Sequence, residues 1–132
     1  MWTIIAGIFF MAHGMVHLLY AGQSERYFEL KPGMIWPDGS WTFSKLIGDE
    51  STRLLAAVLL ALSAIGFIVA GAALLFRQEW WHPTVIVSAT FSTVMFFLLW
   101  DGKFQALDEK GLVGVFINAV IFAFIIFLNR NT

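Results

Sequence analysis

The sequence contains no cysteine, and only 13% of its 132 residues are charged. The absence of cysteine excludes disulfides, thiolate metal sites and cysteine nucleophiles. A soluble domain of ordinary composition carries about 25% charged residues, so the low charged fraction argues against a soluble fold. The net charge is −1 with eight lysine and arginine residues. The chain therefore offers no basic patch, and nucleic acid is not an expected partner.

Apolar residues take the place of the missing charge, at 59% of the chain with a mean hydropathy of +0.78. The long apolar runs lie at 2–22, 53–76, 83–100 and 112–129. Each is long enough to cross a bilayer, which requires about 17–25 residues, and a chain this small could not bury them all in a core of its own. We predict a single all-α domain, 1–132: an integral membrane antiparallel four-helix bundle surrounded by the lipid bilayer.

The ends of the runs support this prediction. The six tryptophans lie at or beyond the run ends, where an aromatic belt meets the membrane interface. The first run has no basic residues before it and no small-residue cleavage site after it, so we expect a retained span rather than a signal peptide.

The segment 23–52 is the one long connection. It contains the turn signal Pro37-Asp-Gly39 and many apolar residues. We expect a structured loop that folds back as a cap on the bundle or lies in the interface. The acidic run before Arg53 is expected to cap the second helix through Asp49 or Ser51.

The basic residues predict an orientation. With an even number of spans, both termini lie on one side of the membrane, and the long loop lies on the other with the segment 101–111. The long-loop side carries Arg26, Lys31, Lys45, Arg53, Lys103 and Lys110, and the other side carries Arg77 and Arg130. The positive-inside rule then places the long loop in the cytoplasm and the termini outside.

Two histidines, His13 and His17, lie in the middle of the first run. Their spacing of four residues places both rings on one face of a helix. Ionisable side chains at this depth are costly and rare, and they mark functional sites by default.

Other polar side chains are predicted in the same half of the membrane. Counted at about 1.5 Å per residue from the long-loop surface, Asn118 and Thr93 reach the depth of the histidines, and Tyr20 and Asp101 lie at the rim. We predict a half-membrane polar pocket lined by His13, His17 and these four residues.

The chemistry of the histidines is open among four interpretations. In the first, they bond to Asn118, Thr93 or backbone carbonyls and hold the helices in register. In the second, they are metal ligands, with Asp101, Asn118, His82 or Met15 as a possible third. In the third, they share a haem with another chain, because two histidines on one helix face cannot hold both faces of one haem. In the fourth, His17 and Asp101 form an acid/base pair in a ligand pocket.

The stretch Ala12-His13-Gly14…His17-Leu18 resembles the first helix of an uncharacterised family of small bacterial four-helix membrane proteins. Looser similarity continues through Ser40-Trp41, Gly66-Phe67 and the Gly114…Asn118 stretch. The resemblance implies a four-span fold in a bacterial inner (plasma) membrane and points to His13 and His17, but it implies no substrate.

The sequence thus favours a small membrane binding or accessory protein whose polar pocket receives a small amphiphilic ligand or a partner helix, within a homo-oligomer or a larger membrane complex. The alternative is a metal- or haem-associated membrane protein or enzyme that uses His13 and His17 as ligands or acid/base groups. The sequence names no cofactor and leaves enzymatic activity undecided.

Overall fold

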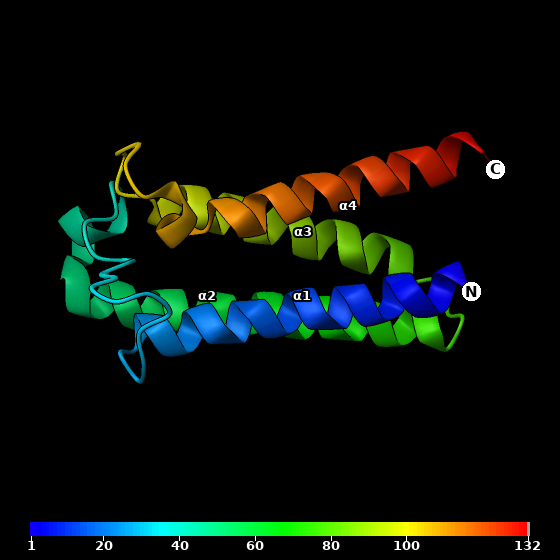
Figure 1. The fold of residues 1–132 in the computed structure, drawn as a ribbon, viewed down its shortest axis with the longest axis horizontal. Coiled ribbons are helices and arrows are strands. Elements are labelled where there is room, and N and C mark those ends of the chain that lie inside the picture. Colours follow the sequence, from blue (N-terminus) through cyan, green and yellow to red (C-terminus); the bar gives the residue numbers. More distant parts are fainter. Residues whose placement is uncertain (132) are drawn as a thin grey trace.

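The chain forms four long antiparallel helices, in a computed structural model that describes residues 1–131. They are α1 (Trp2–Ser24), α2 (Phe43–Leu75), α3 (Trp81–Leu99) and α4 (Leu112–Arg130), with a short 3-10 helix, η1 (Leu107–Lys110), before α4. Both termini lie at one end of the bundle, and the 25–42 loop lies at the other end with the 100–111 segment (Figure 1). All four helices are long and apolar enough to cross a membrane. The protein is therefore an all-α integral membrane four-helix bundle.

Three of the predicted spans agree with the helices to within two residues, but the second does not. α2 begins at Phe43 rather than at residue 53, and its helix is interrupted at Gly48, where φ is 81° and ψ is 165°. The prediction of Asp49 or Ser51 as a helix cap is therefore wrong. One carboxylate oxygen of Asp49 instead accepts hydrogen bonds from the Gly39 amide at 2.9 Å and the Ser44 hydroxyl at 2.6 Å.

Helices α1 and α2 pack backbone against backbone. A Cβ atom added to Gly14 would lie 2.9 Å from the carbonyl oxygen of Ala64, and one added to Gly71 would lie 2.5 Å from that of Gly7. Glycine removes the side chain that would otherwise separate the helices, and small residues are the usual means of close helix packing in lipid. This packing turns the histidine face of α1 toward α3 and α4.

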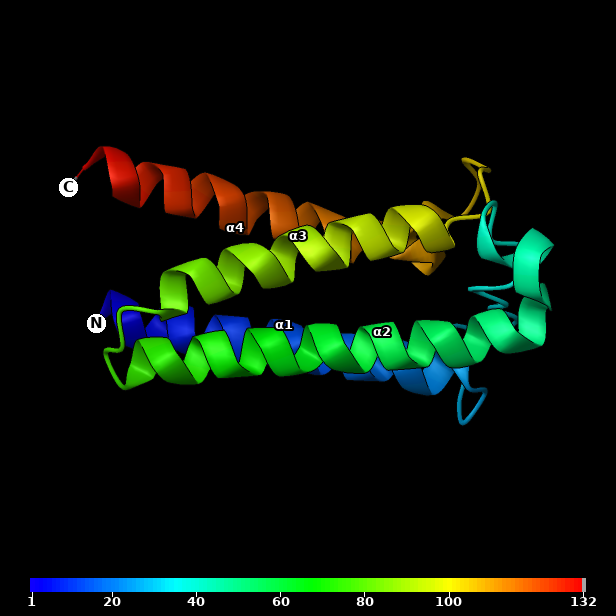
Figure 2. The same ribbon diagram turned by 180° about the vertical axis from the view of Figure 1, so that it is seen from behind.

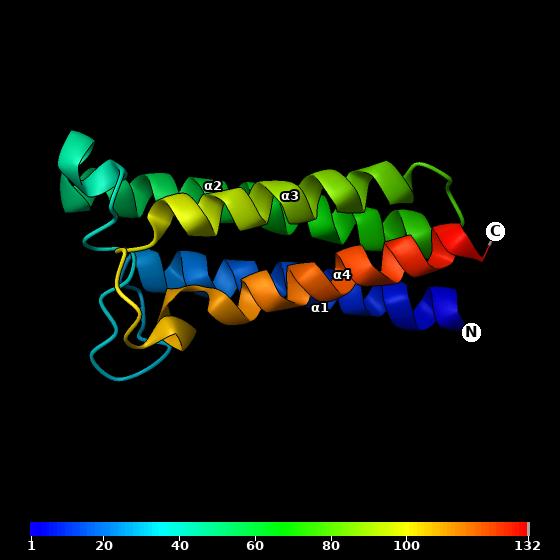
Figure 3. The same cartoon turned by 90° about the horizontal axis from the view of Figure 1, so that it is seen from above.

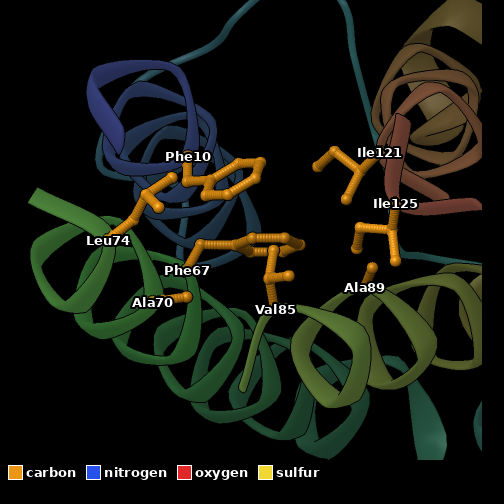
Figure 4. Close-up of a cluster of buried hydrophobic side chains, with 8 residues drawn as sticks. All are labelled: Phe10, Phe67, Ala70, Leu74, Val85, Ala89, Ile121 and Ile125. Atoms are coloured by element: carbon orange, nitrogen blue, oxygen red, sulfur yellow. The ribbon is translucent and has the colours of Figure 1, made fainter. Parts of the chain in front are cut away.

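A buried hydrophobic cluster fills the half of the bundle nearer the termini, and all four helices contribute to it (Figure 4). Its members are Phe10, Phe67, Ala70, Leu74, Val85, Ala89, Ile121 and Ile125. A second cluster fills the other half and includes Tyr20, Leu60 and Phe96 together with Met34 and Trp36 from the loop. The 25–42 loop therefore caps the bundle as predicted, although it is shorter than the expected 23–52.

Charged side chains hold the loop in place. Asp38 binds the guanidinium of Arg53 through both carboxylate oxygens, at 2.7 and 2.6 Å, and it pairs with Arg26 at 3.1 Å. Arg26 also donates to the carbonyls of Ile35 and Trp36, at 2.6 and 2.9 Å. Two arginines from α1's end and α2 thus fix the turn at Asp38.

The loop also completes the end of α3. The last carbonyl groups of a helix have no partner within the helix. Here the hydroxyls of Ser40 and Thr42 both donate to the carbonyl of Leu98 at 2.7 Å, and the indole of Trp41 donates to that of Phe97 at 2.9 Å. The same short stretch of loop therefore ties α3 to the start of α2, which Figures 2 and 3 show lying beside it.

Candidate functional site: a buried polar network

Five polar side chains from three helices bond to one another in the middle of the bundle, and we call them the polar network. They are His13 and His17 on α1, Ser92 and Thr93 on α3, and Asn118 on α4. His13, His17, Ser92 and Asn118 are 3, 1, 0 and 0% exposed. The histidines therefore face protein and not lipid.

The bonds of the network are short and direct. The Nε2 atom of His13 lies 2.8 Å from Oδ1 of Asn118, and Nε2 of His17 lies 2.7 Å from the hydroxyl of Ser92. The amide nitrogen of Asn118 donates to Ser92 at 3.0 Å and to Thr93 at 3.1 Å. Asn118 thus joins α4 to both α1 and α3.

One backbone carbonyl fixes the tautomer of a neutral His17 and, through it, the donor and acceptor roles of Ser92 and Asn118. The Nδ1 atom of His17 is 2.8 Å from the carbonyl oxygen of His13, which can only accept, so Nδ1 of His17 carries the proton. In a neutral ring, Nε2 of His17 then accepts from the hydroxyl of Ser92. The oxygen of Ser92 must in turn accept from the amide of Asn118.

The same reasoning assigns His13. Because the amide nitrogen of Asn118 faces Ser92, its Oδ1 atom faces His13 and accepts a proton from Nε2. Within residues 1–131 no carboxylate bonds to either ring, and an unpaired charge at this depth is expensive, so both rings are neutral. The Nδ1 atom of His13 is then a lone-pair acceptor, and among the described residues this buried atom has no hydrogen-bond partner.

Of the predicted site residues, four lie in the network and two lie outside it. His13, His17, Thr93 and Asn118 meet as expected. The hydroxyl of Tyr20 instead donates to the backbone carbonyl of Asp108 at 3.2 Å, and its ring packs edge-on against Phe96.

The predicted acid/base pair of His17 and Asp101 is wrong. Both ring nitrogens of His17 are bonded within the network, as described above. The carboxylate of Asp101 accepts from the Lys103 amide at 2.9 Å and pairs with Lys110 at 3.0 Å. The loop after α3 thus supplies local partners for Asp101 and keeps it away from the histidines.

Ser92 is the network residue that the sequence analysis missed. Ser88 and Thr93, which lie on the same helix, donate to the carbonyls four residues before them, at 2.8 Å each. Such back-bonding is the common state of hydroxyl residues in a helix, whereas the hydroxyl of Ser92 meets both His17 and Asn118. A signal was available, since Ser92 precedes Thr93 in the sequence and therefore lies at nearly the same depth.

The network does not enclose an open pocket, because its members bond to one another directly. Two apolar grooves flank α4, and Thr93 of the network lines one of them. The groove between α3 and α4 has a volume of about 470 Å³, and Thr93, Trp100, Lys110 and Val115 are among its lining residues. The groove between α1 and α4 has a volume of about 340 Å³ and is lined by apolar residues.

The geometry offers little to a metal ion or a haem. Three of the four imidazole nitrogens are occupied by hydrogen bonds. Among residues 1–131, no group of three or more histidine or acidic side chains is placed to hold a metal, whereas catalytic zinc uses three protein ligands. Metal ligation by His13 and His17 would require the network to break.

Comparison of the chain with protein-family models, with curated proteins and with solved structures finds no match. The resemblance to small bacterial four-helix membrane proteins therefore stays a prediction from the sequence.

Proposed function

We propose that this protein is a small integral membrane binding protein that holds a single-chain anionic amphiphile in the groove between α3 and α4. The amphiphile's apolar chain lies between the two helices, and its carboxylate or phosphate head lies at Lys110. This proposal keeps the predicted ligand class and moves the site from the closed polar network to the groove beside it.

The lining of the groove is the observation that carries the proposal. Aromatic and aliphatic side chains form its walls, and the only polar lining residues are Thr93, toward the middle of the bundle, and Lys110, the last residue of η1. The surface of the groove is almost entirely apolar, which suits the acyl chain of a lipid-like molecule, and Lys110 stands at one end of it. Grooves between the helices of a bundle are common ligand sites.

Lys110 has the means to hold an anionic head. Its ammonium group pairs with Asp101 at 3.0 Å and donates to the carbonyl of Lys103 at 3.3 Å. An ammonium group has three N–H donors, so one remains for a ligand. The indole of Trp100, at the same end of the groove, donates to the carbonyl of Lys103 at 2.8 Å, so the groove end has a fixed shape.

The polar network supports this groove rather than forming it. Thr93 lines the groove and accepts a hydrogen bond from Asn118 at 3.1 Å. The network thus sets the distance between α3 and α4 at the inner end of the groove. This role corresponds to the first interpretation of the histidines, in which they hold the helices in register.

The setting of the protein is part of the same proposal. We place it in a bacterial inner membrane, with the long loop in the cytoplasm and the termini outside, either as a homo-oligomer or within a larger membrane complex. The basic residues of the loop end and the resemblance of the first helix support this placement.

Native mass spectrometry from a gentle detergent tests the proposal, with palmitate and lysophosphatidylglycerol, which have one acyl chain each, as probes. Val115 lines the groove, whereas Val113 on the same helix is 52% exposed. We expect Val115→Trp to abolish the saturable 1:1 adduct and Val113→Trp to retain it. The proposal fails if wild-type protein forms no such adduct, or if both tryptophan variants bind alike.

A further inference from the structure

A charged pocket lies where the end of α1 meets α2, at the loop end of the bundle. Its volume is about 390 Å³, and its lining residues are Glu25, Arg26, Glu50, Ser51, Arg53 and Leu54. The hydroxyl of Ser24, the last residue of α1, donates to the carbonyl oxygen of Arg53 at 2.7 Å, which fixes the two helices to each other beside the pocket. The charged pocket shares no lining residue with the α3–α4 groove, so it is a separate site.

The two arginines of the charged pocket already have an acidic partner, whereas its two glutamates have no basic one. Asp38 pairs with Arg53 at 2.6 Å and with Arg26 at 3.1 Å. Within residues 1–131, neither Glu25 nor Glu50 takes part in an ion pair, and Oε1 of Glu25 is a buried atom without a hydrogen-bond partner. With Asp38 included, carboxylates outnumber guanidinium groups by one. The pocket therefore favours a ligand with a positive group and disfavours a purely anionic one.

Arg53 can still hold an anionic group next to these carboxylates. It binds Asp38 through Nε and one Nη atom, at 2.7 and 2.6 Å. A guanidinium group has five N–H donors, so donors of Arg53 remain for a ligand, and the hydroxyl of Ser51 adds another. Unpaired carboxylates beside an arginine with spare donors match a ligand that carries an ammonium group and a phosphate close together.

An apolar face of α2 begins at the charged pocket. Leu54 lines the pocket, and Val58 and Leu62 follow it at intervals of four residues, so they lie on the same face of the helix. All three side chains are exposed, and we call them the α2 stripe. The pocket therefore lies at the boundary between the charged and the apolar parts of α2, which is the level of the lipid head groups. A ligand in the pocket can extend acyl chains along the stripe.

We propose that the charged pocket binds the head group of a phosphoethanolamine lipid. The ammonium group lies at Glu25 and Glu50, the phosphate lies at Arg53, and the acyl chains follow the α2 stripe. A primary ammonium group has three N–H donors and can bond to both carboxylates, whereas the quaternary ammonium group of a choline lipid has none. A glycerol lipid brings only negative charge. The site is independent of the anionic amphiphile, which lies in the α3–α4 groove.

A series of lipids with the same two oleoyl chains tests the recognition of the head group. Phosphatidylethanolamine, its N,N-dimethyl derivative and phosphatidylcholine all keep the phosphate and the positive charge, but they carry successively fewer N–H donors. Phosphatidylglycerol lacks the positive charge. Native mass spectrometry of wild-type protein in a gentle detergent measures each affinity. We expect phosphatidylcholine to bind about tenfold more weakly than phosphatidylethanolamine, the equivalent of one lost hydrogen bond to a charged group. The dimethyl lipid should lie between them.

The double variant Glu25→Gln/Glu50→Gln removes both charges and keeps the side-chain sizes. Since neither carboxylate has a basic partner in the protein, we expect a melting temperature within a few degrees of the wild-type value. Phosphatidylethanolamine should bind about tenfold more weakly, and no better than phosphatidylcholine. The control is Glu79→Gln, which makes the same exchange in the turn between α2 and α3, at the opposite end of the bundle (Figure 1). It should bind phosphatidylethanolamine as the wild type does.

Two further measurements identify the site and the source of the head group. Val115→Trp fills the α3–α4 groove and should keep the phosphatidylethanolamine adduct. Soluble glycerophosphoethanolamine, which has no acyl chains, should displace the lipid poorly. The proposal is overturned if phosphatidylcholine or phosphatidylglycerol binds as tightly as phosphatidylethanolamine, or if the double glutamine variant binds as the wild type does. It is also overturned if Val115→Trp abolishes the adduct, or if glycerophosphoethanolamine binds as tightly as the lipid.

Discussion

Helices α1 and α2 are joined through their backbones, whereas α4 is joined to the bundle through side chains. Glycines bring α1 and α2 into contact at several turns, as at Gly7, Gly14 and Gly71. Gly114 on α4 and Gly111 directly before it instead face the ring of Phe96, and apolar grooves flank the helix on both sides. α4 is also the least buried helix, with 22% of its most apolar segment buried against 39% for each of the others.

The two kinds of contact fail in different ways. Two backbones in contact have nothing that can rotate aside, so an added atom forces the helices apart. Asn118 makes three hydrogen bonds from α4, to His13, Ser92 and Thr93. Interhelical hydrogen bonds in membranes average about 0.6 kcal/mol each. α4 is therefore attached by a few specific hydrogen bonds, whereas α1 is attached to α2 by close backbone packing along its length.

The strongest test of this difference compares one added methyl group in the two places. In Gly71→Ala the new Cβ would lie 2.5 Å from the carbonyl oxygen of Gly7, and in Gly114→Ala it would lie 3.1 Å from a ring carbon of Phe96. We expect Gly71→Ala to lower the free energy of unfolding by about 3 kcal/mol and Gly114→Ala by less than about 1 kcal/mol, because the ring can turn away. Reversible unfolding in mixed micelles measures both, and equal losses would refute the comparison.

The second test removes the polar attachment of α4. Asn118→Leu replaces the amide with a side chain of similar size and leaves His13 and Ser92 without their partner. We expect a loss of about 2 kcal/mol and faster amide hydrogen exchange in α4 than in α1 or α2. Ser63→Ala is the control, because the Ser63 hydroxyl donates only to the carbonyl of Leu59 in its own helix, at 3.0 Å. A uniform rise in exchange over all four helices would contradict the dependence of α4 on the hydrogen bonds of Asn118.

The smallest effect is expected at the surface, where Lys31 in the loop pairs with Asp108 in η1. The hydrogen bond from Lys31 lowers the pKa of the Asp108 carboxyl, and the same bond raises the pKa of Lys31. A carboxyl with a lowered pKa in the folded state stabilises above its unfolded pKa of about 4 and loses this contribution as the pH falls below it. The loop should therefore be held equally from about pH 5 to pH 9 and loosen in acid.

Hydrogen exchange of the 28–34 amides, corrected for the intrinsic pH dependence, measures this effect. Asp108→Asn should show faster exchange near neutral pH and no further acid loosening. If the variant and the wild type show the same acid profile, Asp108 does not hold the loop.

The fold was predictable because the bilayer sets a length that the apolar runs must match, and three of the four helices follow it closely. The start of α2 was not predictable in this way, since the acidic run at Asp49 is typical of a helix start, and the interruption at Gly48 lies within a longer helix. Helical spacing placed both histidines on one face. It could not show whether Ser88, Ser92 or Thr93 meets them, because that depends on how α3 is rotated in the bundle. Asp101 was placed at the rim correctly, but its partners come from the irregular segment that follows, where no periodicity applies.

The length of α2 has a consequence for how the protein lies in the membrane. Its 33 residues would span about 50 Å as a straight helix, whereas the hydrocarbon layer is about 30 Å thick. Residues 43–47, before Gly48, make up about 8 Å of this surplus, and they turn sideways at the loop end of the bundle (Figures 1 and 2). This arm exposes the apolar side chains of Leu46 and Ile47 beside Lys45. We expect this arm to lie at the level of the lipid head groups and to fix the depth of the bundle in the membrane.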